Sequence, residues 1–269
     1  DGPPPVTYDA AAAAALLLAN RRAGRPAGPL PAGLAPADEG EGVAAQLALA
    51  RLMEAVPPAG FKIGATTARM QAYLGLSSPA AGFMPRDGLH ASGARLPWSA
   101  ARGLGVECEI GVRLAADLPP GPCEVARAAA AVGEMFAAIE VVENRYGTPP
   151  AGDIKALGTA TLIADQFYHA GAVLGAPAPG WCALDLAAVA GRIEVDGAVR
   201  AEGKGADLLG HPMNALAWLA GSSAARAFEG LRAGQVVMLG SVTLPIWLDG
   251  PCHVRVTFDG LGVAEVAFA

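Results

Sequence analysis

The sequence predicts an α+β fold, in which a strand-rich mixed β core (residues 59–269) follows an N-terminal helical arm (residues 1–58). Segments with helical spacing dominate the first fifth of the chain, and segments typical of strands dominate the rest. Helices and strands do not alternate regularly, which argues against a doubly wound parallel sheet. The length of 269 residues favours one large domain with an appendage, because domains hold about 150 residues.

The predicted arm holds two helices. The first covers residues 9–20, where Asp9 precedes a run of alanine and leucine and the cations Arg21 and Arg22 follow it, as the helix dipole favours. A signal peptide carries its positive charge before the apolar run, so this segment does not resemble one. The second helix covers residues 38–55 and ends before two consecutive prolines.

The elements expected in the core are short and bounded by glycine, proline or a turn dipeptide. Two Asp-Gly pairs, at residues 196–197 and 259–260, predict hairpin turns. Strands are expected at residues 59–66, 106–114, 137–145, 160–166, 171–175, 192–203, 235–242 and 252–268. Helices are expected at residues 68–74, 124–136 and 211–220. The core is therefore expected to contain more strand than helix.

Composition and motifs exclude several classes of protein. The net charge is −6 and the sequence has no large basic patch, which argues against nucleic-acid binding. No stretch of about 18 apolar residues could span a membrane. Phosphate-loop, dinucleotide-binding, GxSxG and HExxH motifs are absent. The four cysteines are scattered, which favours reduced thiols and a cytoplasmic location; they are Cys108, Cys123, Cys182 and Cys252.

Three glutamates form the clearest candidate site. Glu107 and Glu109 lie two positions apart on an expected strand, so their side chains share one face of it. Such a pair is costly on an apolar strand unless a cation compensates it, although the same spacing also fits a solvent-exposed face. Glu140 interrupts the apolar run "AAIEVV", where solubility does not explain it. Three carboxylates can hold one Mg²⁺ or Mn²⁺ and leave positions for substrate and water.

For several other polar residues, the sequence alone allows both a functional and a structural interpretation. Lys62, in "GFKIG", could bind a substrate carboxylate or move a proton, or it could extend along its strand to solvent. Glu143 and Arg145 could support the metal site or form a surface ion pair. His211 precedes Pro212 at the start of a helix, where it could be functional or could fix the loop.

Five segments occur in a characteristic order: "GFKIGATT", "VECEIGV", "AAIEVVENR", "GHPMNALAWLA" and "AGQVVMLGSV". Together they resemble the 2-keto-4-pentenoate hydratase / 4-oxalocrotonate decarboxylase family of the fumarylacetoacetate hydrolase superfamily. The resemblance runs from about residue 38 to residue 268, and the matched spacing makes it specific. It implies the β-roll of the fumarylacetoacetate hydrolase C-terminal domain, with residues 59–269 as the catalytic domain.

The resemblance also implies roles for individual residues. The metal ligands that it implies are Glu107, Glu109 and Glu140. The catalytic residues that it implies are Lys62, Asp87, Asp165 and Ser241. Asp87 falls in the loop that closes the site, Asp165 matches the acid of the family's "ADN" segment, and Ser241 follows a glycine near the substrate.

The activity that the resemblance implies is a hydro-lyase reaction of aromatic meta-cleavage catabolism. With Mg²⁺ or Mn²⁺ as cofactor, the enzyme would add water to a 2-hydroxy-2,4-dienoate of the 2-keto-4-pentenoate type and give a 4-hydroxy-2-keto acid. The alternatives are a 4-oxalocrotonate-type decarboxylase, another C–C hydrolase of the superfamily, a non-catalytic accessory subunit, and a plain structural domain. The resemblance further implies a cytoplasmic homo-oligomer that can associate with a homologous decarboxylase, and no nucleic-acid or membrane partner.

Three segments depart from the family pattern. Residues 148–160 match poorly, and the sequence "QFYH" at residues 166–169 replaces a usual small polar run. Pro85 and Arg86 stand where small or acidic residues are expected. These differences bear on the choice of substrate. A second cation near the site would favour a diacid, and Arg86 is the candidate for it.

Overall fold

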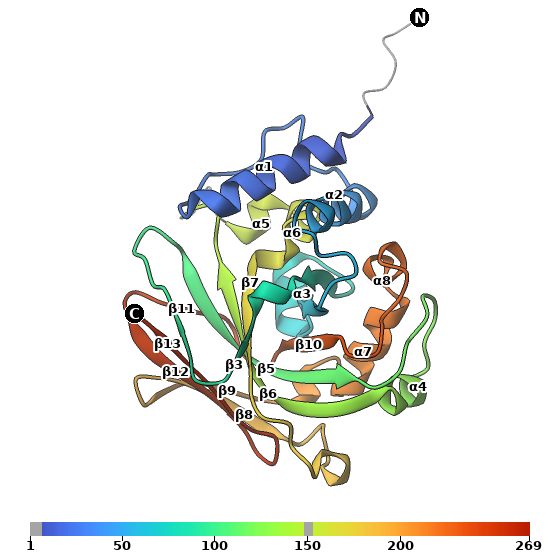
Figure 1. Cartoon of the computed structure of the whole chain (residues 1–269), viewed down its shortest axis with the longest axis vertical. Helices are drawn as coiled ribbons and strands as arrows, with labels where there is room; N and C mark the ends of the chain where they lie inside the picture. Colours follow the sequence, from blue (N-terminus) through green and yellow to red (C-terminus); the bar gives the residue numbers. More distant parts are fainter. Residues whose placement is uncertain (1–6, 148–152) are drawn as a thin grey trace, which may run out of the picture.

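Two curled β-sheets form the centre of the molecule, and helices gather along one side of them (Figure 1). The computed structural model describes residues 7–147 and 153–269, so part of the divergent stretch 148–160 lies outside the described residues. The strands are β1 (Gly60–Gly64), β2 (Ala80–Met84), β3 (Leu89–Ala91), β4 (Ala94–Leu96), β5 (Leu104–Leu114), β6 (Val132–Glu143), β7 (His169–Leu174), β8 (Ala190–Val195), β9 (Ala198–Lys204), β10 (Val236–Ser241), β11 (Ile246–Trp247), β12 (Cys252–Phe258) and β13 (Gly262–Phe268). The helices are α1 (Ala10–Ala23), α2 (Glu39–Leu52), α3 (Ala68–Leu74), α4 (Val125–Ala130), α5 (Ile154–Leu157), α6 (Thr159–Ala164), α7 (Pro212–Gly221) and α8 (Ser223–Ala227).

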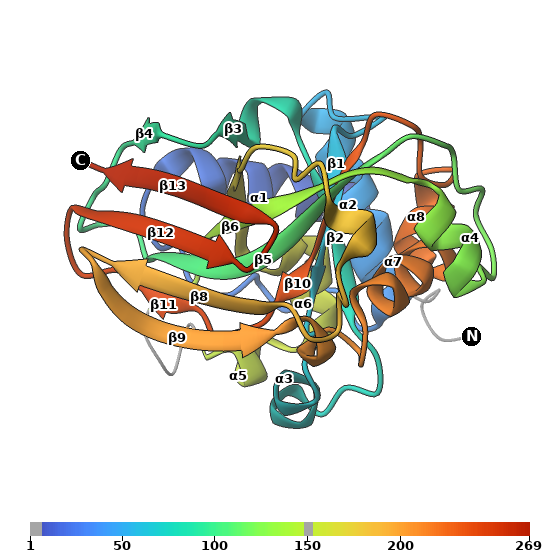
Figure 2. The same cartoon turned by 90° about the horizontal axis from the view of Figure 1, so that it is seen from below.

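The larger sheet runs in the order β2-β1-β10-β5-β6-β7-β3, and β11 also pairs with β5. The smaller sheet runs in the order β4-β13-β12-β8-β9. Both sheets mix parallel and antiparallel pairs, since β1 is parallel to β10 and β4 is parallel to β13. Figure 2 shows the smaller sheet lying across the long strands β5 and β6. The predicted α+β fold with a strand-rich mixed core is thereby confirmed.

The long strand β5 separates the apolar core from the polar site. Its residues Val106, Cys108 and Ile110 are fully buried in the main core, which also contains Val254 and Val256 of β12. Because side chains alternate along a strand, the residues between them point to the opposite face. That opposite face carries the two glutamates of β5, so the packing of the core fixes the direction in which the acids point.

The helical arm packs into the same core. Asp9 caps α1 by accepting a hydrogen bond from the amide of Ala12, and the helix continues to Ala23, beyond the predicted end at residue 20. Asp38 caps α2, which ends at Leu52 rather than at residue 55. The side chain of Gln46 is fully buried and donates to the carbonyl oxygens of Ala81 and Ile163, at 2.8 and 2.7 Å. The arm is therefore joined to strand β2 and helix α6 by buried polar contacts.

Two sequence predictions were wrong. The helix predicted at residues 124–136 ends at Ala130, because residues from Val132 onward pair with β5 and this pairing outweighs their helix propensity. The strand predicted at residues 160–166 is helix α6, since a short apolar run fits a buried helix as well as a strand. The hairpins at the two Asp-Gly pairs and the helix at residues 68–74 are confirmed. None of the described helices has the length and apolar character needed to cross a membrane.

Candidate metal centre

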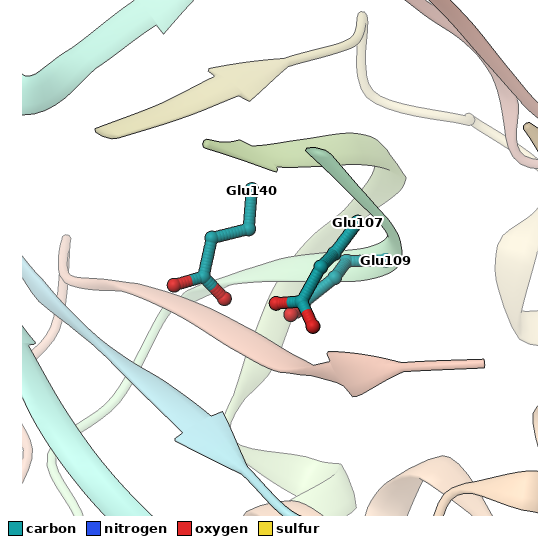
Figure 3. A group of neighbouring side chains, drawn as sticks. All are labelled: Glu107, Glu109 and Glu140. Atoms are coloured by element: carbon teal, nitrogen blue, oxygen red, sulfur yellow. The ribbon is translucent and has the colours of Figure 1, made fainter. Parts of the chain in front are cut away.

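The candidate site is built on two neighbouring strands of the larger sheet. Glu107 and Glu109 point from the same face of β5, because they lie two positions apart. In the register between β5 and β6, Glu140 lies directly opposite Glu107. Figure 3 shows the carboxyl group of Glu140 approaching the other two from the neighbouring strand. One carboxylate oxygen from each residue lies within 4.8 Å of the others.

These carboxyl groups face one another in buried surroundings. Burial and the charge of Glu140 raise the pKa of Glu107 to about 8. Burial and the two neighbouring carboxylates raise the pKa of Glu109 well above its usual range. Burial also acts to raise the pKa of Glu140, but Lys62 and His169 outweigh it and lower this pKa to about 2. Like charges on opposing strand positions destabilise a sheet, so a bound cation would stabilise the arrangement.

The polar partners leave part of each acid available. The amide of Gly240 donates to Glu109 Oε2 at 3.0 Å. Glu140 Oε1 lies 2.9 Å from His169 Nδ1 and 3.2 Å from Lys62 Nζ. Their other oxygens, Glu109 Oε1 and Glu140 Oε2, are buried and have no hydrogen-bond partner in the described part of the chain. Because hard divalent cations prefer carboxylate oxygens, this donor set fits a divalent cation.

Lys62 does not extend to solvent. It lies on β1, its side chain is 2% exposed, and its ammonium group donates to the carbonyl oxygen of Phe167 at 3.1 Å. The same ammonium group contacts Glu140. The side chain is thus fixed at the edge of the carboxylate cluster, where it faces the cavity beside Glu107.

Ser241 ends β10, which pairs with β5, and its register partner is Glu109. Its hydroxyl lies 3.5 Å from the hydroxyl of Thr243 and accepts a hydrogen bond from the amide of Thr243. Lys62, Glu107 and Ser241 line one cavity, here called the inner cavity. The predicted site residues that the structure brings together are Lys62, Glu107, Glu109, Glu140 and Ser241.

His169 is a site residue for which no role was predicted from the sequence. It begins β7, which pairs with β6, and its ring contacts Glu140. Burial lowers the pKa of His169 below its usual value, which favours the neutral ring. Its second nitrogen, Nε2, is buried without a hydrogen-bond partner among the described residues. The divergent "QFYH" segment marked this region, but no spacing linked His169 to Glu140, because their contact depends on the pairing of two strands.

Asp165 lies outside the inner cavity, beneath the helical arm. Its carboxylate accepts from Arg21 at 2.8 Å, from Arg145 at 3.3 Å and from the hydroxyl of Tyr146 at 3.1 Å. Both arginines also donate to the backbone carbonyl of His169. Asp165 therefore secures the segment that presents the histidine, and it does not face the three glutamates.

Asp87 is also placed away from the metal centre. It is an exposed residue of the 3₁₀ turn Arg86–Gly88 and lines a separate cavity with Arg21 and Glu143. Arg86 is exposed and does not line the inner cavity. The described structure thus gives neither residue a contact with the carboxylate cluster.

Two ambiguous sequence features are structural. His211 caps α7, since its Nδ1 accepts a hydrogen bond from the amide of Met213 at 3.1 Å. Glu143 is buried and accepts two hydrogen bonds from Arg102, at 2.8 and 2.7 Å. It also lies 3.9 Å from Arg145. Glu143 and Arg145 therefore form buried ion pairs rather than the exposed pair that the sequence also allowed.

Comparisons with known proteins identify the family to which this chain belongs. Residues 62–268 match the family model described as "Fumarylacetoacetate (FAA) hydrolase C-terminal". The chain belongs to this fumarylacetoacetate hydrolase family.

Individual relatives are similar over most of the chain. The 2-keto-4-pentenoate hydratase of Burkholderia vietnamiensis is 33% identical over 209 residues, covering 78% of this chain and 77% of that protein. The 2-keto-4-pentenoate hydratase 2 of Dechloromonas aromatica is 32% identical over 260 residues, covering 96% and 97%. The solved 4-oxalocrotonate decarboxylase from Pseudomonas putida G7, complexed with magnesium and adipate, superposes with a TM-score of 0.85 at 24% identity over 97% of each chain. This last similarity shows a shared fold.

Proposed function

We propose that this protein is a divalent-metal-dependent hydro-lyase. It adds water to a 2-hydroxy-2,4-dienoate of the 2-keto-4-pentenoate type and gives a 4-hydroxy-2-keto acid. The observation that carries the proposal is the convergence of Glu107, Glu109 and Glu140, with two buried oxygens that have no partner in the described chain. The two relatives named hydratases support the type of reaction, and one of them is covered almost completely.

Glu107, Glu109 and Glu140 would hold Mg²⁺ or Mn²⁺, and the structure neighbour complexed with magnesium supports a divalent metal. When bound, the cation supplies positive charge that stabilises the oxyanion of a chelated 2-keto acid. His169 and Lys62 hold one oxygen of Glu140 in place, so they position this ligand from behind. Gly240 does the same for Glu109 through its amide.

The proton transfers fall to residues that face the inner cavity. In the first step the dienol loses the proton of its 2-hydroxyl group and gains a proton at C5, which gives a conjugated ketone. In the second step the oxygen of water bonds to C4 and a proton is added at C3. Lys62 is the proposed acid and base, and Ser241 the group that orients substrate or water.

The two other residues that the family resemblance implied to be catalytic, Asp165 and Asp87, do not face the inner cavity. We propose a positioning role for Asp165, which acts through Arg21 and Arg145 on the carbonyl of His169. A catalytic role for Asp87 stays a sequence-based prediction, in which its loop would have to approach the metal centre.

The test is the ultraviolet absorbance of 2-hydroxypenta-2,4-dienoate mixed with the protein. Loss of the dienol band is expected with Mg²⁺ or Mn²⁺, and EDTA should abolish it. Glu109→Gln should also abolish it, by at least about a hundredfold in rate, because a metal ligand is removed. The matched control is Glu134→Gln, which removes only an exposed carboxylate paired with Arg113 and should keep the wild-type rate.

Other outcomes identify the alternatives. Release of CO₂ from 4-oxalocrotonate without hydration of the dienoate would indicate a decarboxylase. Metal binding without turnover of either compound would indicate another substrate or an accessory subunit. Absence of metal binding would contradict the central proposal.

We also propose the organisation that the sequence implied. Residues 59–269 would form the catalytic domain and residues 1–58 an arm that braces it through Arg21 and Gln46. A cytoplasmic homo-oligomer, which can associate with a homologous decarboxylase, stays part of the proposal. Light scattering of the purified protein, alone and mixed with such a decarboxylase, tests the assembly.

A further inference from the structure

The inner cavity continues away from the metal centre into a second, larger space. This outer hollow has a volume of about 740 Å³, within the range of about 300–1,000 Å³ that small-molecule sites occupy. Lys62 and Glu107 line the inner cavity and not the outer hollow. Six residues line both spaces and form the neck between them: Met70, Ile154, Tyr168, Leu244, Pro245 and Trp247.

The wall of the neck is mainly apolar, and large apolar side chains continue to the mouth. Trp247 is 48% exposed, Leu244 is 40% exposed and Tyr73, in the outer hollow, is 51% exposed. Large exposed apolar side chains gathered at one cavity mark a binding surface rather than an ordinary surface. The neck therefore offers an apolar environment to whatever part of a substrate points away from the metal.

A strained segment supplies one aromatic ring of this wall, that of Tyr168, and one ring of the inner cavity, that of Phe167. Gln166, Phe167 and Tyr168 have positive φ angles of 58°, 49° and 65°, which non-glycine residues rarely adopt. Such conformations persist only where surrounding contacts hold them. Here Lys62 binds the carbonyl of Phe167, and the ring of Tyr168 packs edge-on against Trp247 with centroids 6.3 Å apart. The strain is found in the segment that departs from the family's small polar run.

The cations that line the two spaces are already paired with acidic side chains. Among the described residues that line the inner cavity, Lys62 is the cation, and it is held by Glu140 and by a backbone carbonyl. Arg102 is the cation that lines the outer hollow, and Glu143 binds its guanidinium at two atoms. Asp153 adds a negative charge to the same hollow. A second substrate carboxylate would therefore lie in the neck without an available cation from the described lining.

We propose that the neck selects substrates whose far end, at C5 of the dienoate, carries an apolar alkyl or aryl group, and that it discriminates against a second carboxylate there. The inference rests on the proposed function, in which the 2-oxo acid end of the substrate lies at the metal centre. Burying an apolar group in the neck is favourable, whereas burying an unpaired carboxylate is strongly unfavourable.

Calorimetry with Mg²⁺ tests this selection by comparing three ligands that have no double bond to hydrate. These are 2-oxopentanoate and its derivatives with a phenyl group or a carboxylate on C5, namely 5-phenyl-2-oxopentanoate and 2-oxohexanedioate. The phenyl compound is expected to bind about tenfold more tightly than the parent or better, and the diacid no more tightly than the parent. A diacid that binds as tightly as the phenyl compound, or no binding by any of the three, overturns the inference.

A charge placed in the neck should reverse the preference. Leu244→Arg is expected to raise the affinity for the diacid and lower that for the phenyl compound, each by about fivefold or more, because the new cation pairs the second carboxylate. Leu244 is partly exposed, so the variant should fold. Val199→Arg is the matched control, since Val199 is an exposed apolar residue on β9 that does not line the neck. An unchanged order of affinities in Leu244→Arg would show that the far end of the ligand lies elsewhere.

Measuring turnover of the dienoate distinguishes a failure of the hydratase proposal from a failure of the proposed selectivity of the neck. If the phenyl compound binds preferentially but no dienoate loses its absorbance, the hydratase proposal fails and the selectivity of the neck stands. If 2-hydroxypenta-2,4-dienoate is hydrated but the diacid is the better ligand, the hydratase proposal stands and the selectivity of the neck fails.

Discussion

At the scale of single residues, the candidate metal centre is built from carboxyl groups that repel one another when they are ionised and no cation is present. Glu107 and Glu140 occupy directly opposing positions on neighbouring strands. The raised pKa of Glu107, about 8, reflects its burial and this neighbour. If the three acids hold a cation as proposed, they do so at some expense to the stability of the metal-free fold.

The variant Glu107→Gln should distinguish the contribution of Glu107 to metal binding from its cost to the stability of the metal-free protein. The pKa of Glu107 is raised to about 8, so its full charge opposes that of Glu140 only above this pH. At about pH 9 and without metal, the neutral glutamine should therefore raise the free energy of unfolding by about 0.2–1 kcal/mol over that of the wild type, whereas near pH 7 the two proteins should be close. Excess Mg²⁺ should raise the Tm of the wild type, because ligand that binds only the native state stabilises it by about 2.7 kcal/mol at a hundred times its Kd. The variant should lose this rise. Thermal unfolding in EDTA and in Mg²⁺ measures both.

The exposed pair of Glu134 and Arg113 supplies the control. Glu134→Gln should keep the full metal-dependent rise in Tm. A Glu107→Gln protein that keeps the rise as well would show that Glu107 is not a ligand.

The three glutamates and Lys62 could be predicted as site residues from the sequence, whereas the contact of His169 with Glu140 and that of Arg21 with Asp165 could not. Alternation along β5 places Glu107 and Glu109 on one face, and an apolar context makes Glu140 conspicuous. His169 reaches Glu140 only through the pairing of β6 with β7, which no local pattern reveals. Asp165 was identified from a motif, but its partner Arg21 lies 144 positions away.

At the scale of elements, the end of β10 shapes the metal centre. Gly240 has a φ of +111° and donates its amide to Glu109. A Cβ atom at this position would collide with the side chain of Thr66. The close approach of these two segments therefore depends on glycine at residue 240.

Gly240→Ala should destabilise the protein by about 2 kcal/mol or more, because a strained φ and a steric clash act together. In a chain of this length that corresponds to a fall in Tm of roughly 4 °C or more. Gly234→Ala is the matched control, since Gly234 also has a positive φ, of +86°, but nothing lies within 4 Å of its added Cβ. Its cost should be about 1 kcal/mol. Equal losses in the two variants would mean that the clash with Thr66 is relieved.

The elements that the sequence predicted correctly are those whose local signals agree with the fold. The Asp-Gly hairpins formed as expected because turn chemistry and strand alternation coincide there. Residues 132–136 were predicted as helix because their alanine-rich surroundings favour it. Pairing with β5 outweighs that propensity, and such long-range pairing is invisible in a local window.

At the scale of the whole molecule, buried ion pairs tie separate segments together and make stability depend on pH. Burial acts to raise the pKa of Glu143, but hydrogen bonds from Arg102 and the charge of Arg145 outweigh it and lower the pKa below its usual value. A carboxylate with a lowered pKa in the folded state adds stability above its unfolded pKa and loses it as the pH falls through the folded value.

Arg102→Leu should therefore cost more at neutral pH than in acid. At pH 7 the loss is expected to be about 1–3 kcal/mol, since a charged hydrogen-bonded partner is removed. Below about pH 4.5, where Glu143 takes up a proton when unfolded, the difference between variant and wild type should shrink. Urea unfolding at several pH values measures it. A difference that stays constant or grows in acid would contradict this assignment.

The ion pair between Arg21 and Asp165 also affects the order in which parts of the protein can fold. Helix α1 is made long before β7 and α6, yet its arginine completes the support behind His169. Contacts that join distant parts of a chain form slowly, because a large loop has to close before they stabilise anything. During synthesis, therefore, Arg21 has no partner in Asp165 until 144 further positions of the chain have been made, and the support behind His169 forms only after that.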